Sequence, residues 1–341
     1  MTRRNYIDYL RALGCITIVA LHLIGEGYTR TTNNTYYSYL KCLQILTQWA
    51  VPMFVMASGC NMLGRENEWF IVKKHIKKMA RITILWGLIY MIADPMVDWI
   101  MRNPIDLSLS RIHQLFRGQA FHMWFCFMIM GMYLLIPILN PIIKEKRRCE
   151  YFILIIIISE VILPIASYIG NIIPVVGSVA EYLRFPRFGF YLAYFVLGYY
   201  LEWHANFTKR TRMVFYGIGV MAVGFLVINE YLTIAFNLRI VTINGLREFF
   251  NTLFAVAVFV FFKYDFKIGK MYPIVKKVAD ESMGIYLMHA YVYIRLSYKG
   301  IHGATINPLL AVPLVTTLIV VTCYLASRMI RKIPVVGKWL L

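Results

Sequence analysis

The recurrence of long apolar runs along the whole chain is the feature that most constrains its fold. Runs such as YFILIIIISEVILPIA (151–166) and NTLFAVAVFVFF (251–262) contain almost no charge. Hydrophobic residues make up 60% of the 341 residues and charged residues only 16%, whereas an ordinary soluble domain has roughly 45–50% apolar and about 25% charged residues. Because about 20 apolar residues cover the hydrocarbon core of a bilayer, the chain is predicted to be an all-α integral membrane protein.

Ten segments are predicted to cross the membrane and to form one domain. No stretch between them is long enough for an appended soluble domain, so a single polytopic domain is expected over residues 1–341. Pro52, Pro137 and Pro164 fall inside predicted spans and should kink them. The ten spans are predicted over residues 6–25, 42–63, 82–100, 122–143, 151–169, 187–203, 213–232, 247–263, 282–298 and 309–327.

The lysines and arginines are distributed unequally between the two ends of these spans. On the side of the N-terminus lie 24 of the 36 basic residues, and the opposite side has 11. Cytoplasmic loops carry an excess of Lys and Arg, so both termini are predicted to be cytoplasmic in a multi-pass cell membrane protein. Short basic clusters between apolar spans also indicate that the net charge of +19 contacts anionic lipid headgroups and not nucleic acid. The six cysteines have no metal-ligand or disulfide spacing, and we expect them to be packing residues.

The first predicted span carries an arginine and a histidine in the sequence RALGCITIVALH (11–22). Eleven residues of α-helix come within about 20° of three full turns, so Arg11 and His22 share one helix face, about 16 Å apart along the axis. Ionisable groups inside a membrane usually face a bundle interior or a wet cavity, and a neutral imidazole is the usual general base near neutral pH. The alternative is structural, with His22 hydrogen-bonded to a neighbouring helix.

Other polar residues stand where apolar ones would be expected or cluster at the ends of spans. In KKHIKKMAR (73–81), Lys77, Lys78 and Arg81 could neutralise a polyphosphate, or they could simply mark a cytoplasmic loop. A buried carboxylate such as Glu160 must be paired or protonated. The remaining candidates are His122 and Trp124 in FHMWF and His289 in IYLMHAY.

Five segments together resemble the acyltransferase-3 family of membrane enzymes, which acylate sugars and other hydroxyl acceptors. They are IDYLRALGCITIVALH (7–22), VPMFVMASGCNML (51–63), HMWFCFMIMGMYLLIPIL (122–139), YLAYFVLGYYL (191–201) and SMGIYLMHAY (282–291). The most specific of these features is the element of arginine, ten residues and histidine in the first span. The family's Arg-x-x-Arg element before the third span reads Lys78-Met79-Ala80-Arg81 here. This departure keeps the charge but loses one bidentate guanidinium fork.

The resemblance implies transfer of an acyl group, most simply acetyl, from cytoplasmic acyl-CoA to a hydroxyl of a carbohydrate or glycolipid acceptor. It implies that His22 is the general base, that Glu160 or His122 assists it, and that no metal takes part. It further implies that Trp124 and His289 lie at the acceptor. The basic residues at the inner end, which would bind the donor phosphates, are Arg11, Lys77, Lys78 and Arg81. A bacterial plasma membrane is the compartment that the resemblance implies.

Two further possibilities follow from the same residues. Ten spans with kinking prolines and buried charges are also typical of a transporter, in which His22 and Glu160 would couple transport of a small polar molecule to protons. Within the enzymatic interpretation, the acceptor either attacks the thioester directly or receives the acyl group from an acyl-histidine. A non-catalytic scaffold would bind no acyl donor and transport nothing.

Overall fold

Every regular element that the structure describes is a helix, as the apolar runs predict. The computed structural model describes residues 4–100, 121–169, 189–238 and 244–341, and no strand occurs in these ranges. The helices are α1 (Asn5–Arg30), α2 (Asn34–Thr47), α3 (Ala50–Met62), α4 (Glu68–Ile100), η1 (Phe121–Met123), α6 (Trp124–Leu134), α7 (Ile136–Ile143), α8 (Lys146–Ile157), η2 (Ile158–Ile162), α9 (Leu163–Ile169), α11 (Gly189–Trp203), α12 (Lys209–Phe236), α13 (Asn244–Tyr264), α14 (Tyr272–Tyr298), α15 (Pro308–Lys332) and α16 (Pro334–Leu340).

Each of the ten predicted ranges coincides with a helix or with a broken set of helices. In the described part of the chain, five helical segments are long and apolar enough to cross a membrane, or six if the bent pair α6–α7 counts as one span. α11 is described from Gly189, directly after residues that lie outside the described ranges. The all-helical membrane architecture is therefore confirmed. The number of ten spans and the cytoplasmic position of both termini stay predictions.

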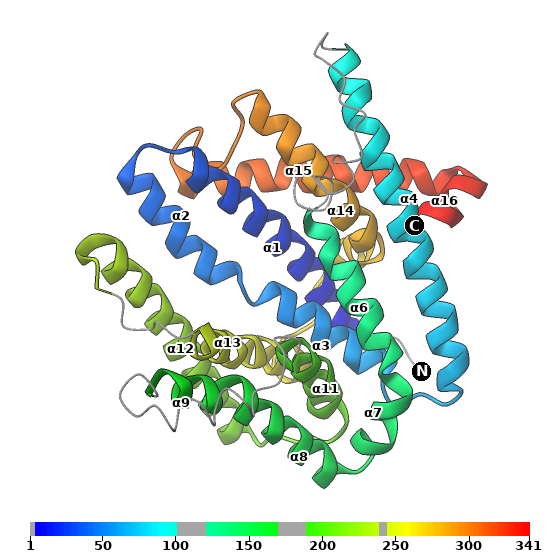
Figure 1. The fold of residues 1–341 in the computed structure, drawn as a ribbon, viewed down its shortest axis with the longest axis vertical. Helices are drawn as coiled ribbons and strands as arrows, with labels where there is room; N and C mark the ends of the chain where they lie inside the picture. The colour runs from blue at the N-terminus through cyan, green and yellow to red at the C-terminus, as the bar shows by residue number, and fades with distance from the viewer. Residues whose placement is uncertain (1–3, 101–120, 170–188, 239–243) are drawn as a thin grey trace.

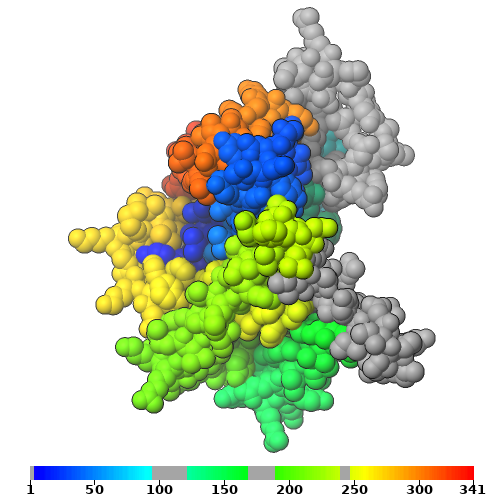
Figure 2. Space-filling view, turned by 90° about the vertical axis from the view of Figure 1, so that its left-hand side faces the viewer, coloured from blue at the N-terminus to red at the C-terminus, as the bar shows by residue number. Residues whose placement is uncertain are grey.

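α1 lies at the centre of the bundle, where it packs against α14, α2, α3 and α15 (Figure 1). α2 separates α1 from α12, and Figure 2 shows it as the blue surface between the orange end of α14 and α15 and the yellow-green α12. Twelve of the 26 residues of α1 are buried, which is an unusually large share for a helix that also carries Arg11 and His22. The C-terminal helix α16 packs against α4 (Figure 1).

α3 and α11 approach each other more closely than side chains allow. A Cβ atom added at Gly59 would collide with the backbone carbonyl of Phe195, and one added at Gly198 would collide with the carbonyl of Met56. Small residues permit such backbone contact between membrane helices, where van der Waals packing is a main source of helix association. Five of the six cysteines are buried, as packing residues are, and Cys42 is half-buried.

The three prolines coincide with irregular helix. The ring of Pro52 removes the donor that would bind the carbonyl of Gln48, and this carbonyl accepts a hydrogen bond from Asn251 Nδ2 at 3.4 Å instead. Pro137 lies in the first turn of α7, directly after a 58° bend. Pro164 follows the π-helical turn η2. The predicted kink is confirmed at Pro137, whereas those at Pro52 and Pro164 stay predictions.

Candidate active site

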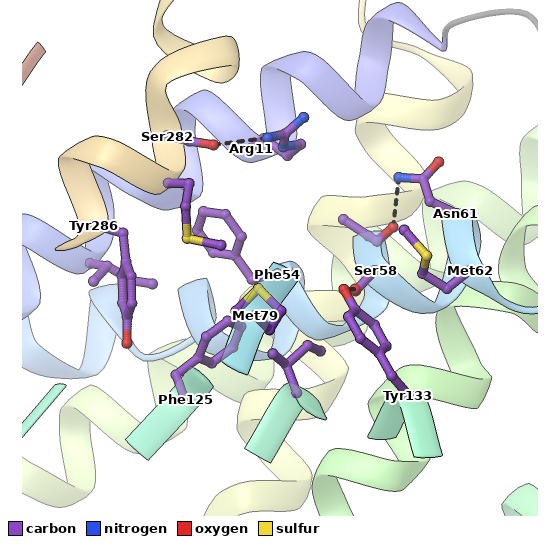
Figure 3. A pocket seen from close by; sticks show the side chains of 14 residues that line it. Arg11, Phe54, Ser58, Asn61, Met62, Met79, Phe125, Tyr133, Ser282 and Tyr286 are labelled. Carbon is purple, nitrogen blue, oxygen red and sulfur yellow. Dashed lines mark hydrogen bonds between the residues drawn. The ribbon is translucent and has the colours of Figure 1, made fainter. Parts of the chain in front are cut away.

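Arg11 and His22 lie on one face of α1, as their spacing predicts, and each meets groups from other helices. Arg11 Nη2 donates a hydrogen bond to Ser282 Oγ of α14 at 3.0 Å (Figure 3). The His22 ring packs edge-on against Phe121 of η1, with 5.0 Å between centroids. It stacks on His289 of α14 with 5.2 Å between centroids. The two ends of this face of α1 therefore lie in different chemical surroundings.

Three histidines, far apart in the sequence, come together at the second of these places. The rings of His122 and His289 meet edge to face at 5.1 Å, and His289 also contacts His22. His122 is 1% exposed and His289 is 0% exposed, whereas His22 is partly exposed. His22 is therefore the most exposed member of the cluster. No group of His, Cys, Asp or Glu in the described ranges is arranged to hold a metal ion.

The hydrogen bonding of His289 fixes its tautomer. Its Nδ1 lies 2.5 Å from the backbone carbonyl oxygen of Tyr286. A carbonyl only accepts, so Nδ1 carries the proton and Nε2 of the neutral ring is an acceptor. Nε2 is buried and has no hydrogen-bond partner among the residues described. The cluster therefore contains a fixed acceptor beside His22.

A cavity of about 260 Å³ lies beside α1, with Arg11 of α1 and Ser282 and Tyr286 of α14 in its wall (Figure 3). Ile18, one helical turn before His22, lines it on α1. Phe125 and Tyr286 also line it, and the Tyr286 ring contacts His122 at 5.4 Å and His289 at 5.7 Å between centroids. The residues of the cavity wall that carry polar groups are Arg11, Ser58, Asn61, Tyr133, Ser282 and Tyr286, and the rest of the wall is apolar.

The end of the cavity near Arg11 is surrounded by cations. Burial lowers the pKa of the Lys78 amine below its usual value, and the neighbouring charges of Arg331, Arg81 and Arg11 lower it further. Burial likewise lowers the pKa of His75, and the positive charges of Arg65, Lys74 and Lys78 lower it further. These shifts have the sign expected where positive charges crowd without enough negative charge between them. The arrangement favours an anionic ligand.

Two of these cations are held by the C-terminal part of the chain. Arg81 Nη2 donates to the carbonyl of Lys338 at 3.1 Å, and its guanidinium lies 5.3 Å from the ring centroid of Trp339 in α16. Arg81 Nε is buried and has no hydrogen-bond partner within the described ranges. Arg331 of α15 pairs with the buried Glu281 at 2.8 Å. The guanidinium groups are therefore oriented by the fold and do not sample solvent freely.

The remaining predicted residues lie outside these two clusters. Lys77 is exposed on α4, as is the neighbouring Lys78 of the cationic cluster. Trp124 is 41% exposed and packs against Tyr191 of α11 at 5.4 Å between ring centroids. Glu160 is buried in η2, against Gly189 at the start of α11. η2 packs against α8, α9, α11 and α13, whereas His22 faces α14.

Sequence reasoning missed several residues that the fold brings to the site. Tyr286 precedes His289 by three residues, so helical spacing could have placed both on one face. Arg65 and Arg331 look like ordinary loop charges in the sequence, and Ser58, Asn61 and Tyr133 carry no pattern at all. These residues come together only through the packing of helices.

The fold and the site define a helical membrane protein in which a cavity beside Arg11 is lined at Tyr286 by a ring that also contacts the histidine cluster. The chain belongs to the acyltransferase-3 family, because the family's acyltransferase domain matches residues 4–328, nearly its whole length. It is thus an acyltransferase-family membrane protein, as its motifs predicted. The same comparisons find no matching curated protein and no matching solved structure.

Proposed function

We propose that the protein transfers an acyl group, most simply acetyl, from cytoplasmic acyl-CoA to a hydroxyl of a sugar or glycolipid on the opposite side of a bacterial plasma membrane. The observation that carries this proposal is the cavity between Arg11 and the turn before His22. It offers a path of the right polarity for a donor with an anionic head and a long, slender thioester arm. Family membership supports acyl transfer, and the residues along this path support the choice of donor.

The donor phosphates would bind at the cationic end. Arg81 and Lys78 supply charge at the mouth, and Arg11 supplies it within the cavity wall. A hydrogen bond between charged partners contributes about 1.5–3 kcal/mol. Three such contacts are sufficient to hold a nucleotide while the arm extends along α1. Lys77, which is exposed, contributes long-range attraction.

His22 would act as the general base. It takes the proton as the acceptor oxygen attacks the thioester carbonyl and the new carbon–oxygen bond forms. The tetrahedral intermediate then breaks its carbon–sulfur bond, and the leaving thiolate takes the proton from the imidazolium to give the thiol of CoA. A base placed in this way contributes about 10²–10⁴-fold to the rate.

The two buried histidines would support His22. His289 presents Nε2 as an acceptor, which can bind a hydroxyl of the incoming substrate. The ring of His122 packs against His289 and limits its rotation. Trp124 would contact the acceptor from the more exposed side. Glu160 stays outside this mechanism, because η2 packs in the part of the bundle formed by α8, α11 and α13.

The test is thioester consumption by the purified protein. We expect it to consume acetyl-CoA and to transfer acetyl to a sugar acceptor, and we expect His22→Ala to lose about 10²–10⁴-fold in turnover. Circular dichroism and size-exclusion behaviour of this variant should match the parent protein. His204→Gln is the matched control, because His204 hydrogen-bonds the Ile143 carbonyl at 2.6 Å, outside the site. Full turnover in His22→Ala would refute the assignment of the base.

A further inference from the structure

The helix face that carries Arg11 and His22 continues toward the end of α1. Glu26 and Arg30 follow His22 at intervals of four residues, so they lie on the same face, with Glu26 about 6 Å beyond His22. The Glu26 side chain is 20% exposed and that of Arg30 is 41% exposed. The face therefore leads from the partly exposed imidazole to the surface at the end of the bundle opposite Lys78.

α14 presents a matching row to this face. His289, Tyr293 and Ser297 also follow one another at intervals of four, and α14 packs along α1. The Tyr293 ring lies within 9° of parallel to the His22 ring, with 6.5 Å between centroids. Ser297 Oγ donates a hydrogen bond to Glu26 Oε1 at 2.6 Å. The two rows thus meet at His22 and again one turn farther out, at Glu26.

One oxygen of Glu26 remains available. Arg30 Nε and Ser297 Oγ both bind Oε1, and within the described ranges no hydrogen bond or ion pair involves Oε2. Arg30 neutralises the carboxylate, so this outer pair has no net charge. Burial and the charge of Arg30 lower the pKa of the neighbouring His302, against a smaller raising effect of the Glu26 charge, and the net lowering favours the neutral imidazole. An uncharged ligand is therefore favoured here over an anion.

We propose that Glu26, oriented by Ser297 and Arg30, binds hydroxyl groups of a neutral sugar or polyol acceptor and thereby holds another hydroxyl of the same molecule at His22. This inference rests on the proposed function and adds the acceptor subsite. Glu26 Oε2 accepts a hydrogen bond from one hydroxyl, while the remaining Arg30 N–H groups donate to its neighbour. The separation of about 6 Å between the levels of His22 and Glu26 on the helix is comparable with the width of one sugar ring.

The test separates acceptor binding from donor chemistry. Acetyl-CoA hydrolysis is measured first without acceptor, and acetyl transfer is then measured with glycerol and with methyl glycosides of glucose, galactose, mannose and N-acetylglucosamine. Glu26→Gln removes a charged hydrogen bond while keeping the shape of the side chain. We expect it to raise the acceptor KM by about 10- to 100-fold. The donor KM and the hydrolysis rate should stay within about twofold of the parent values.

Two further variants keep the result interpretable. Ser297→Ala should raise the acceptor KM less than Glu26→Gln does. It removes one hydrogen bond that orients the Glu26 carboxylate, but it leaves the carboxylate itself in place. Glu145→Gln is the control, since Glu145 forms a comparable local pair with Arg148 at 2.8 Å at the start of α8, and it should change neither KM.

The possible failures are distinguishable. An unchanged acceptor KM in Glu26→Gln, or a parent protein that hydrolyses acetyl-CoA but acetylates none of the five acceptors, would overturn the subsite and leave the donor reaction standing. A parent protein that neither hydrolyses nor transfers acetyl from acetyl-CoA would overturn the proposed function itself.

Discussion

His22 stacks on His289, with 5.2 Å and 29° between the two rings, while His289 Nδ1 is bound to the carbonyl of Tyr286. Stacked imidazoles do not hydrogen-bond each other in the plane of their rings. His289 therefore keeps its acceptor nitrogen for another group, and it holds the His22 ring in place through contact between the faces. The pair therefore combines a partly exposed imidazole with one whose tautomer is fixed.

This division predicts unequal losses when each histidine is replaced. His289→Gln removes a fixed acceptor and a stacking face but no base, so kcat should fall roughly tenfold, the value of one neutral hydrogen bond. The donor KM should stay within about twofold. Steady-state kinetics with acetyl-CoA checks both values beside His22→Gln, which should lose about 10²–10⁴-fold. A larger loss in His289→Gln than in His22→Gln would move the base from one ring to the other.

The crowding of cations around Lys78 predicts a pH dependence of donor binding. Its pKa is lowered by burial and by the charges of Arg331, Arg81 and Arg11. As the pH rises, Lys78 therefore loses its proton earlier than an ordinary lysine, and the donor KM should rise in the same range. Lys78→Arg keeps a permanent charge, so its donor KM should stay flat where that of the parent rises.

Charge removal at the same place should weaken donor binding at all pH values. Lys78→Gln or Arg81→Gln should raise the donor KM by about 10- to 100-fold, as expected for a lost charged hydrogen bond. Lys144→Gln removes an exposed lysine at the end of α7 and should have no effect. The same increase in all three variants would mean that general surface charge attracts the donor and that no site holds its phosphates.

The contact between α3 and α11 predicts that two glycines differ in their tolerance of a methyl group. Gly59→Ala places a Cβ against the carbonyl of Phe195, and the overpacking should destabilise the protein by about 1–3 kcal/mol. Gly217→Ala on α12 meets no atom within 4 Å, so it should be neutral or stabilise by about 0.5–1 kcal/mol through helix propensity. Thermal unfolding of both variants in detergent checks the difference. Equal melting temperatures would show that α3 and α11 can move apart to admit the methyl group without a loss of stability.

Much of the fold follows from the sequence, because apolar length and helical period are local properties. The element of Arg11, ten residues and His22 was readable as one helix face, and the structure places its two ends at the cationic cluster and the histidine cluster. Pro52 and Pro137 likewise marked irregular helix. The predicted span 187–203 contains α11 (Gly189–Trp203), and its first two residues lie outside the described ranges.

The site was predictable only where its residues share one helix. His122 and His289 were single candidates in separate spans, and nothing in their spacing shows that they meet His22. Glu160 looked equally suitable, yet it lies against Gly189, because α8 and η2 pack on α11 and not on α1. Glu26 could have been found from its four-residue interval to His22, but its partner Ser297 could not. Contacts between helices far apart in the chain depend on packing that the hydrophobic pattern alone does not specify.

Binding of CoA separates the enzyme from the transporter that the same buried histidines would also suit. A ligand that binds only the folded protein stabilises it by about 2.7 kcal/mol at 100 times its Kd, so CoA should raise the melting temperature of the detergent-solubilised protein. Added salt should reduce this increase, because the cationic mouth is partly exposed and is screened by ions. Arg81→Gln should also reduce it, whereas His22→Ala should leave it intact, because His22 lies about 16 Å along α1 from Arg11. A parent protein that CoA does not stabilise, but that takes up a small polar molecule into proteoliposomes under a proton gradient, would be a transporter.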